Sequence, residues 1–192
     1  MKSMPNILTV LRLLACPLLI YLFAIADYLW ILIIFVLACL TDFFDGYLAR
    51  KKNFKSNFGK ALDPIADKVL IITMSVLIIV YEEILIGLLV IPFYIIIIRE
   101  IIVSSLRFNL VDKNKNIDVS LLSKYKTFIQ MIAIGSLISF MIYHDPYVFV
   151  GYKANYLTIF LISFVKFFVW LSAFITVITG VQHYKTYLKL KK

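Results

Sequence analysis

The sequence predicts an all-α integral membrane protein with six transmembrane helices and a short N-terminal interfacial segment. Of its 192 residues, 62% are apolar and only 16% are charged, whereas an ordinary soluble domain has about 25% charged residues. The mean hydropathy is +0.95. These values exclude a water-soluble globule, and the high apolar and aromatic content excludes a disordered chain. We expect residues 1–192 to form a single membrane domain.

Six apolar runs are long enough to cross a bilayer, which takes about 20 residues in a helix. They cover residues 8–26, 29–48, 62–80, 84–106, 126–143 and 157–181. The runs are continuous and do not alternate with polar residues, so helices are favoured over a barrel. Before the first run, Ser3 or Asn6 can cap a short helix at the membrane interface. A cleavable signal peptide is the alternative for the first run, but Arg12 interrupts it and the next run follows at once.

Basic residues gather in every second connection between these runs. The net charge is +9, and the positive charges concentrate near residues 2–12, 50–60, 107–126 and 185–192. Because short cytoplasmic loops of membrane proteins are rich in Lys and Arg, both termini and these two loops are predicted to be cytoplasmic. The same charges attract anionic membrane lipids, so the basic composition requires no nucleic-acid partner.

Four acidic residues lie near the cytoplasmic ends of the second and third runs: Asp42, Asp45, Asp63 and Asp67. On a helix, residues three or four positions apart share a face, so each pair points to one side. A carboxylate inside a membrane helix costs at least about 2.5–3.5 kcal/mol, and four close carboxylates cannot all ionise without a counter-charge. Hard oxygen ligands with no His or Cys nearby indicate Mg²⁺ or Mn²⁺. The alternative is that these acids pair with neighbouring basic side chains, namely Arg50, Lys60 and Lys68.

The acidic residues belong to a longer pattern, D-x-x-D-G-x-x-A-R, then eight residues, then G-x-x-x-D-x-x-x-D. Its fixed positions are Asp42, Asp45, Gly46, Ala49, Arg50, Gly59, Asp63 and Asp67. This pattern resembles the signature of the CDP-alcohol phosphatidyltransferase family at every fixed position. The resemblance implies six transmembrane helices, two bound Mg²⁺ (or Mn²⁺) ions and a homodimer. It also implies transfer of a phosphatidyl group from CDP-diacylglycerol to an alcohol, with release of CMP.

Carried over by position, the resemblance gives each motif residue a role. Asp42, Asp45 and Asp63 would be metal ligands, and Asp67 would share in ligation and act as the general base. The residues implied in nucleotide binding are Asp42, Gly46, Ala49, Arg50 and Gly59. The alternative for Arg50 is a loop charge that only sets the membrane topology.

A second polar group must recognise the acceptor alcohol. Arg99 and Glu100 interrupt a very apolar helix, and an intramembrane ion pair is a functional candidate. Arg107 lies eight residues beyond Arg99 and shares its face. Several basic groups that converge near the metal site would suit an acceptor with its own phosphate, and the candidates are Lys126, Arg107, Arg99 and Lys124. The alternative is that Arg99 and Glu100 form an ion pair that only holds helices together.

Over about residues 5–131 the chain resembles bacterial members of the family whose acceptor is sn-glycerol 3-phosphate. The shared features are the Pro5–Thr9 opening with Arg12, the Arg99–Ile101 segment, and the lysines at 124 and 126. The resemblance implies a multi-pass protein of the bacterial plasma (inner) membrane with its active site at the cytoplasmic face. There the sn-1 hydroxyl would attack, giving phosphatidylglycerol phosphate and CMP. Ser123 departs from the pattern, since glycine is expected before the lysine pair.

Two alternatives stay open at this stage. Within the family, the acceptor can be inositol phosphate, serine or phosphatidylglycerol, although serine lacks a phosphate for the basic cluster. A cation transporter could use the four carboxylates as a coupling site, but the chain shows no repeated halves with broken helices. His144 and His183 are predicted to be interfacial residues at opposite faces of the membrane, with no joint site.

Overall fold

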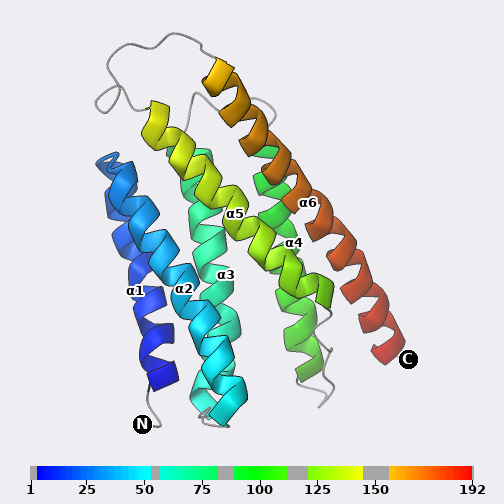
Figure 1. Cartoon of the computed structure of the whole chain (residues 1–192). Helices are drawn as coiled ribbons and strands as arrows, with labels where there is room; N and C mark the ends of the chain where they lie inside the picture. Colours follow the sequence, from blue (N-terminus) through cyan, green and yellow to red (C-terminus); the bar gives the residue numbers. More distant parts are fainter. Residues whose placement is uncertain (1–3, 53–56, 82–88, 112–120, 145–155, 192) are drawn as a thin grey trace. The chain divides into compact units, whose positions relative to one another are not determined.

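The protein is all-α, as predicted, throughout the part that the computed structural model describes (Figure 1). This part comprises residues 4–52, 57–81, 89–111, 121–144 and 156–191. Side chains are described for residues 10–41, 68–80, 89–106, 122–123, 125–143 and 156–189. The helices are α1 (Met4–Ala24), α2 (Tyr28–Lys52), α3 (Asn57–Tyr81), α4 (Val90–Val111), α5 (Leu121–His144) and α6 (Tyr156–Lys191).

Each predicted apolar run coincides with one of these helices, but several helices are longer than their runs. α2 continues to Lys52 and α3 begins at Asn57, so both reach further into the basic connection than the runs at 29–48 and 62–80. α6 continues to Lys191, well beyond the run that ends at residue 181. Hydrophobicity marks the part of a helix that lipid can surround, and a helix can extend past that part into polar surroundings. The start of the fourth run, residues 84–88, lies outside the described residues.

Two helices of the described part are long and apolar enough to cross a membrane, namely Tyr125–Tyr143 within α5 and Tyr156–Lys189 within α6. Three shorter apolar helical stretches cover Val10–Ala24, Tyr28–Thr41 and Lys68–Val80. From Met4 onward α1 is one continuous helix, so no break separates the predicted interfacial segment from the first run.

The helices form two compact units. The first comprises residues 1–81 and 137–153, and the second comprises residues 82–136 and 154–192. In the first unit α1 packs against both α2 and α3. Its core contains three apolar pairs with i, i+4 spacing, one from each of these helices: Leu19 and Phe23, Ile31 and Phe35, and Leu70 and Met74. This spacing places both members of a pair on the face that meets the neighbouring helix.

In the second unit α4 packs against α6, and side chains from the N-terminal part of α5 bond to both. Polarity is inverted here relative to a soluble protein. The charged Arg99 and Glu100 are buried, while Phe160, Phe167 and Phe174 of α6 are each more than 60% exposed. An apolar outer surface around polar contacts is typical of helices that pack within lipid.

The turn between α1 and α2 lies wholly within the described residues. Asp27 N–H donates to the carbonyl of Leu22 and Ala26 N–H to that of Phe23, both at 3.1 Å, which is the Schellman pattern that closes a helix C-terminus. Ala26 adopts the left-handed conformation, with φ of 55°. Asp27 then caps α2, since its Oδ1 accepts the N–H of Trp30 at 3.3 Å.

Ala26→Gly is expected to stabilise the protein by about 0.5–1 kcal/mol, because the left-handed conformation is costly for a residue with a Cβ. The free energy of unfolding of the purified protein in detergent measures this effect. Ala24→Gly is the matched control: it changes the last residue of α1, whose backbone is helical, and should destabilise by up to about 1 kcal/mol. Equal destabilisation by both substitutions would contradict the prediction.

Candidate active site

The motif aspartates lie on helices, as their spacing requires. Asp42 and Asp45 are in the C-terminal part of α2, and Asp63 and Asp67 are in the N-terminal half of α3. The helical backbone supports the inference that each pair shares a face. The side chains of these four residues lie outside the described set, so their roles as metal ligands and general base stay predictions.

The same holds for the other motif positions and for two of the basic residues. The side chains outside the described set are those of Gly46, Ala49, Arg50, Gly59, Arg107 and Lys124. Among the side chains that are described, no group of three or more His, Cys, Asp or Glu residues could hold a metal. The four motif carboxylates stay the predicted ligands of a hard divalent cation.

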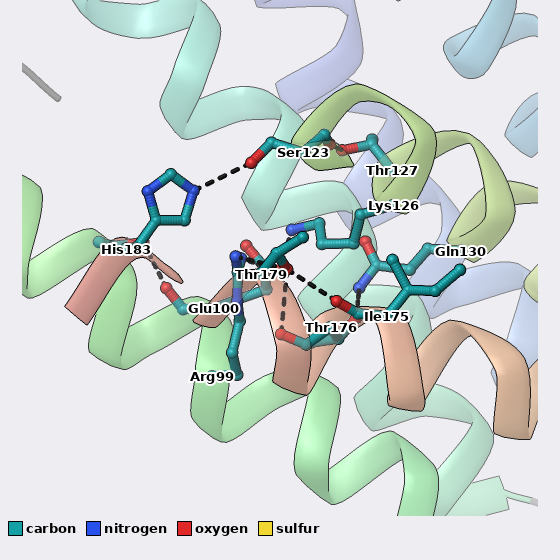
Figure 2. Close-up of polar contacts among 11 residues, drawn as sticks. Arg99, Glu100, Ser123, Lys126, Thr127, Gln130, Ile175, Thr176, Thr179 and His183 are labelled. Carbon is teal, nitrogen blue, oxygen red and sulfur yellow. Dashed lines mark hydrogen bonds and ion pairs between the residues drawn. The ribbon is translucent and has the colours of Figure 1, made fainter. Parts of the chain in front are cut away.

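Arg99 and Lys126 are the two predicted acceptor-site residues whose side chains are described, and both belong to one buried cluster in the second unit. We call this group the buried polar cluster. Its members come from α4, α5 and α6 (Figure 2), and they are Arg99, Glu100, Ser123, Lys126, Gln130, Thr176, Thr179 and His183.

Glu100 lies at the centre of the charged part of the cluster. Its Oε1 accepts a hydrogen bond from Arg99 Nη1 at 2.9 Å, and the same oxygen contacts Lys126 Nζ. All three side chains are at most 10% exposed. Two cations and one carboxylate give these three residues a net charge of +1. Buried charges need close partners and further hydrogen bonds to offset desolvation, and a cationic excess of this kind favours an anionic ligand.

α6 supplies the neutral half of the cluster. Thr179 Oγ1 accepts from Arg99 Nη2 at 2.9 Å, while its own hydroxyl lies 2.9 Å from the carbonyl of Ile175 and 3.0 Å from that of Thr176. Gln130 Nε2 of α5 donates to Thr176 Oγ1 at 3.0 Å. The polar side chains of α6 therefore face α4 and α5 and accept hydrogen bonds from a buried donor on each.

His183 packs against α5. It is only 5% exposed, and its Nε2 is hydrogen-bonded to Ser123 Oγ at 2.9 Å. Its location at the depth of the membrane interface stays a prediction. The bond also gives a physical reason for the departure at Ser123, because glycine there would offer His183 no hydroxyl. The side chain of His144 lies outside the described set.

The sequence contained a signal for the α6 residues that our sequence analysis missed. Ser172, Thr176, Thr179 and His183 follow i, i+4, i+7 and i+11 spacing and thus share one helix face. All four are at most 5% exposed. A stripe of polar residues through an otherwise apolar run indicates the side that packs against other helices rather than lipid.

The Arg99–Glu100 pair joins helices as well as carrying charge. The two residues are neighbours on α4, and the contacts to other helices run from Glu100 to Lys126 of α5 and from Arg99 to Thr179 of α6. The helix-joining alternative and the acceptor-site prediction are therefore compatible, because the same contacts that join the helices also fix the cations.

A family model and several known proteins match this chain, and the longest of these matches cover nearly all of it. The model of the CDP-alcohol phosphatidyltransferase family matches residues 2–181. A relative from Rickettsia typhi, named CDP-diacylglycerol–glycerol-3-phosphate 3-phosphatidyltransferase, is 38% identical over 188 residues, covering 96% of this chain and 97% of its own. Relatives of the same name from Wigglesworthia glossinidia brevipalpis and Bacillus subtilis are 46% and 34% identical over 142 and 152 residues. These matches cover 71% and 79% of this chain, and 76% and 70% of the relatives.

The matched range contains all eight fixed positions of the acidic motif, the whole of α4 and α5, and α6 up to residue 181. A transporter is thereby disfavoured, since the carboxylates belong to the signature of an enzyme family. The chain belongs to the CDP-alcohol phosphatidyltransferase family.

Proposed function

We propose that the protein transfers the phosphatidyl group of CDP-diacylglycerol to the sn-1 hydroxyl of sn-glycerol 3-phosphate, giving phosphatidylglycerol phosphate and CMP in phospholipid biosynthesis. The observation that carries this proposal is the similarity over 96% of the chain to a relative named for these two substrates. The buried polar cluster supports the acceptor, because a net positive charge suits an alcohol that bears a phosphate.

The motif carboxylates carry the reaction. Asp42, Asp45 and Asp63 would hold two Mg²⁺ (or Mn²⁺) ions, with Asp67 sharing in ligation. When bound, such ions neutralise the pyrophosphate of the lipid donor and the departing CMP. Asp67 accepts the proton of the sn-1 hydroxyl while that oxygen attacks the phosphorus next to diacylglycerol and the bond to CMP breaks. The CDP moiety lies against the nucleotide-binding residues, Asp42, Gly46, Ala49, Arg50 and Gly59.

The acceptor phosphate binds to Lys126 and Arg107, with Lys124 as a further contact and Arg99 in the same cationic group. An ammonium group has three N–H donors, so Lys126 can hold the carboxylate of Glu100 and a phosphate together. Charge-assisted hydrogen bonds of this type are about twice as strong as neutral ones. The acceptor would thus be recognised by its phosphate and not by its hydroxyls alone.

The proposed setting is the plasma (inner) membrane of a bacterium, with six spanning helices, a homodimeric assembly and the active site at the cytoplasmic face. The alternation of basic and acidic connections supports this topology. The two candidate spans in α5 and α6 and the exposed apolar surface support contact with membrane lipids.

The acceptor is tested by incubating the purified protein with CDP-diacylglycerol and Mg²⁺ and measuring CMP release with a panel of alcohols. The panel contains sn-glycerol 3-phosphate, glycerol, serine, inositol phosphate and phosphatidylglycerol. We expect CMP release with sn-glycerol 3-phosphate and not with glycerol, which has the same hydroxyls and no phosphate. Faster release with any other alcohol would reassign the acceptor, and loss of activity in EDTA with recovery in Mg²⁺ would support the metal requirement.

Asp67→Asn is expected to lower CMP release by about 10²–10⁴-fold, because the amide cannot accept the proton of the attacking hydroxyl. The matched control is Asp27→Asn at the start of α2, where an asparagine can still cap the helix, and its activity should be unchanged. Near-normal turnover of Asp67→Asn would end the general-base assignment.

Lys126→Ala is expected to raise the KM for sn-glycerol 3-phosphate roughly tenfold or more, with a smaller effect on the KM for CDP-diacylglycerol. Misfolding of a fraction of the protein would lower kcat without changing either KM. A change in the ratio of the acceptor KM to the donor KM therefore indicates an effect on the acceptor site. Lys185→Ala, which removes an exposed charge from α6, is the control. An unchanged acceptor KM would remove Lys126 from the site.

A further inference from the structure

We propose that Arg12 binds a phosphate group of the lipid donor through two parallel N–H donors of its guanidinium, those of Nε and Nη2. Arg12 lies on α1, which carries no residue of the acidic motif. The inference rests on the proposed function for the identity of the donor, CDP-diacylglycerol. It goes beyond that function by adding a phosphate ligand from a helix outside the motif.

Arg12 is buried against α3 in the first unit. A basic residue near the end of a membrane helix usually extends its charged group to the polar interface, but Arg12 is only 2% exposed. Cys16, one turn further along α1, is also buried and forms a side-chain hydrogen bond with Thr73 of α3. Residues four positions apart share a helix face, so Arg12 lies on the face of α1 that packs against α3.

Two adjacent nitrogens of this buried guanidinium make no hydrogen bond. Among the side chains that are described, the buried nitrogens and oxygens without a hydrogen bond are Nε and Nη2 of Arg12 and Nε of Arg99. The N–H bonds of Nε and Nη2 point in parallel along one edge of the planar guanidinium, and such an edge matches two oxygens of one phosphate. Arg12 has a further interaction in the structure, and the inference concerns only this edge.

A phosphate would remove an unfavourable feature of the fold. Buried N–H donors without an acceptor destabilise a protein, and most of them have a partner in native structures. On Arg12 two such donors lie side by side, whereas Arg99 offers only one nitrogen of this kind. A single ligand with two neighbouring anionic oxygens would satisfy both donors of Arg12 at once.

The backbone of α2 places its first motif aspartate at nearly the same depth as Arg12. A tight turn joins α1 to α2, so the two helices run antiparallel. Arg12 lies 12 residues before Ala24, and Leu40 lies 12 residues after Tyr28, so Arg12 and Leu40 are level. Asp42 follows Leu40 by two residues, which is about 3 Å along the helix axis.

The backbone of α3 gives the same result independently. α1 and α3 begin at the same end of the first unit and run in parallel (Figure 1). One helical turn back from the contact between Cys16 and Thr73 brings Arg12 level with Val69. Asp67 precedes Val69 by two residues, again about 3 Å along the axis.

These positions favour the lipid donor as the source of the phosphate. Asp42 and Asp67 belong to the carboxylates proposed to act at the diphosphate of CDP-diacylglycerol, and they lie in the first unit together with Arg12. The cations proposed for the acceptor phosphate whose side chains are described, Arg99 and Lys126, belong to the second unit. A guanidinium on α1 would therefore add a positive group on a further side of the donor diphosphate.

Arg12→Gln is expected to raise the KM for CDP-diacylglycerol roughly tenfold or more, the size expected for lost charge-assisted hydrogen bonds. The KM for sn-glycerol 3-phosphate should change little. Arg12→Lys keeps the charge but not the two parallel donors, so its donor KM should stay raised at least about fivefold. The control is Cys16→Ala, which changes the contact of α1 with α3 one turn away and should leave both KM values near those of the wild type.

Three kinetic results would overturn the proposal. An unchanged donor KM in Arg12→Gln would exclude a contact with the donor. Full recovery in Arg12→Lys would show that only the charge matters and not the pair of donors. An equal rise of the donor KM in Cys16→Ala would assign the effect to the packing of α1 against α3.

A binding measurement separates the donor from other sources of phosphate. The Tm of the purified protein in detergent with Mg²⁺ is measured without acceptor, after addition of CDP-diacylglycerol, phosphatidic acid or inorganic phosphate. We expect Arg12→Lys to reduce the rise in Tm caused by CDP-diacylglycerol and to leave the other two responses as in the wild type. Loss of the response to phosphatidic acid or to inorganic phosphate alone would assign Arg12 to a lipid headgroup or a free phosphate and overturn the proposal. Because Arg12→Lys keeps the buried charge, it carries both tests if Arg12→Gln does not fold.

The proposed function and the role of Arg12 fail in different ways. If CMP is released with another alcohol and not with sn-glycerol 3-phosphate, the proposed acceptor is wrong, and the donor KM of the Arg12 variants is measured with that alcohol. If sn-glycerol 3-phosphate is the acceptor and Arg12→Gln binds CDP-diacylglycerol as the wild type does, the proposed function stands and only the role of Arg12 is overturned.

Discussion

The second unit depends on one carboxylate that two cations share. Glu100 accepts from Arg99 and Lys126 through the same oxygen, and these two residues connect α4 to α6 and to α5. In apolar surroundings a buried charge without a partner is costly, so the positions of the three helices and the ionic contacts depend on each other. The same contacts therefore determine both the packing of this unit and the electrostatics of the proposed acceptor site.

This arrangement explains how a lipid enzyme can combine two very different substrates. The outer surface of α6 is apolar and suits contact with acyl chains, whereas its inner face carries the hydroxyls and the imidazole of the buried polar cluster. A single helix thus separates lipid from a charged interior. The acidic motif lies on α2 and α3, so the proposed reaction assigns the chemistry of the donor and the recognition of the acceptor to different helices.

The sequence predicted the helices well because the length of an apolar run directly reflects the requirement to span lipid. It also placed the eight fixed positions of the acidic motif on two helices, as the structure has them, whereas the roles of these residues stay predictions. It could not predict the pairing of Arg99 with Thr179, which are 80 positions apart. A run of apolar residues identifies a helix, but it does not show how that helix is rotated about its own axis, and this rotation decides which side chains meet the neighbouring helices. For the same reason the burial of His183 against other helices was not predicted, although the stripe that it shares with Ser172 and Thr176 could have indicated a buried face.

Arg99 and Glu100 are adjacent in the chain, and this has a consequence for how the protein enters the bilayer. Their side chains can neutralise each other before any other helix is present, so in the predicted topology α4 would enter the bilayer as a segment without net charge at these two positions. The cost of placing two ionised groups in lipid is thereby reduced at the moment of insertion. Lys126 lies in the second turn of α5, near a membrane boundary in the predicted topology, and can stay hydrated until the helices associate. In the predicted topology, Glu100 would therefore compensate Arg99 during insertion and both Arg99 and Lys126 in the folded unit.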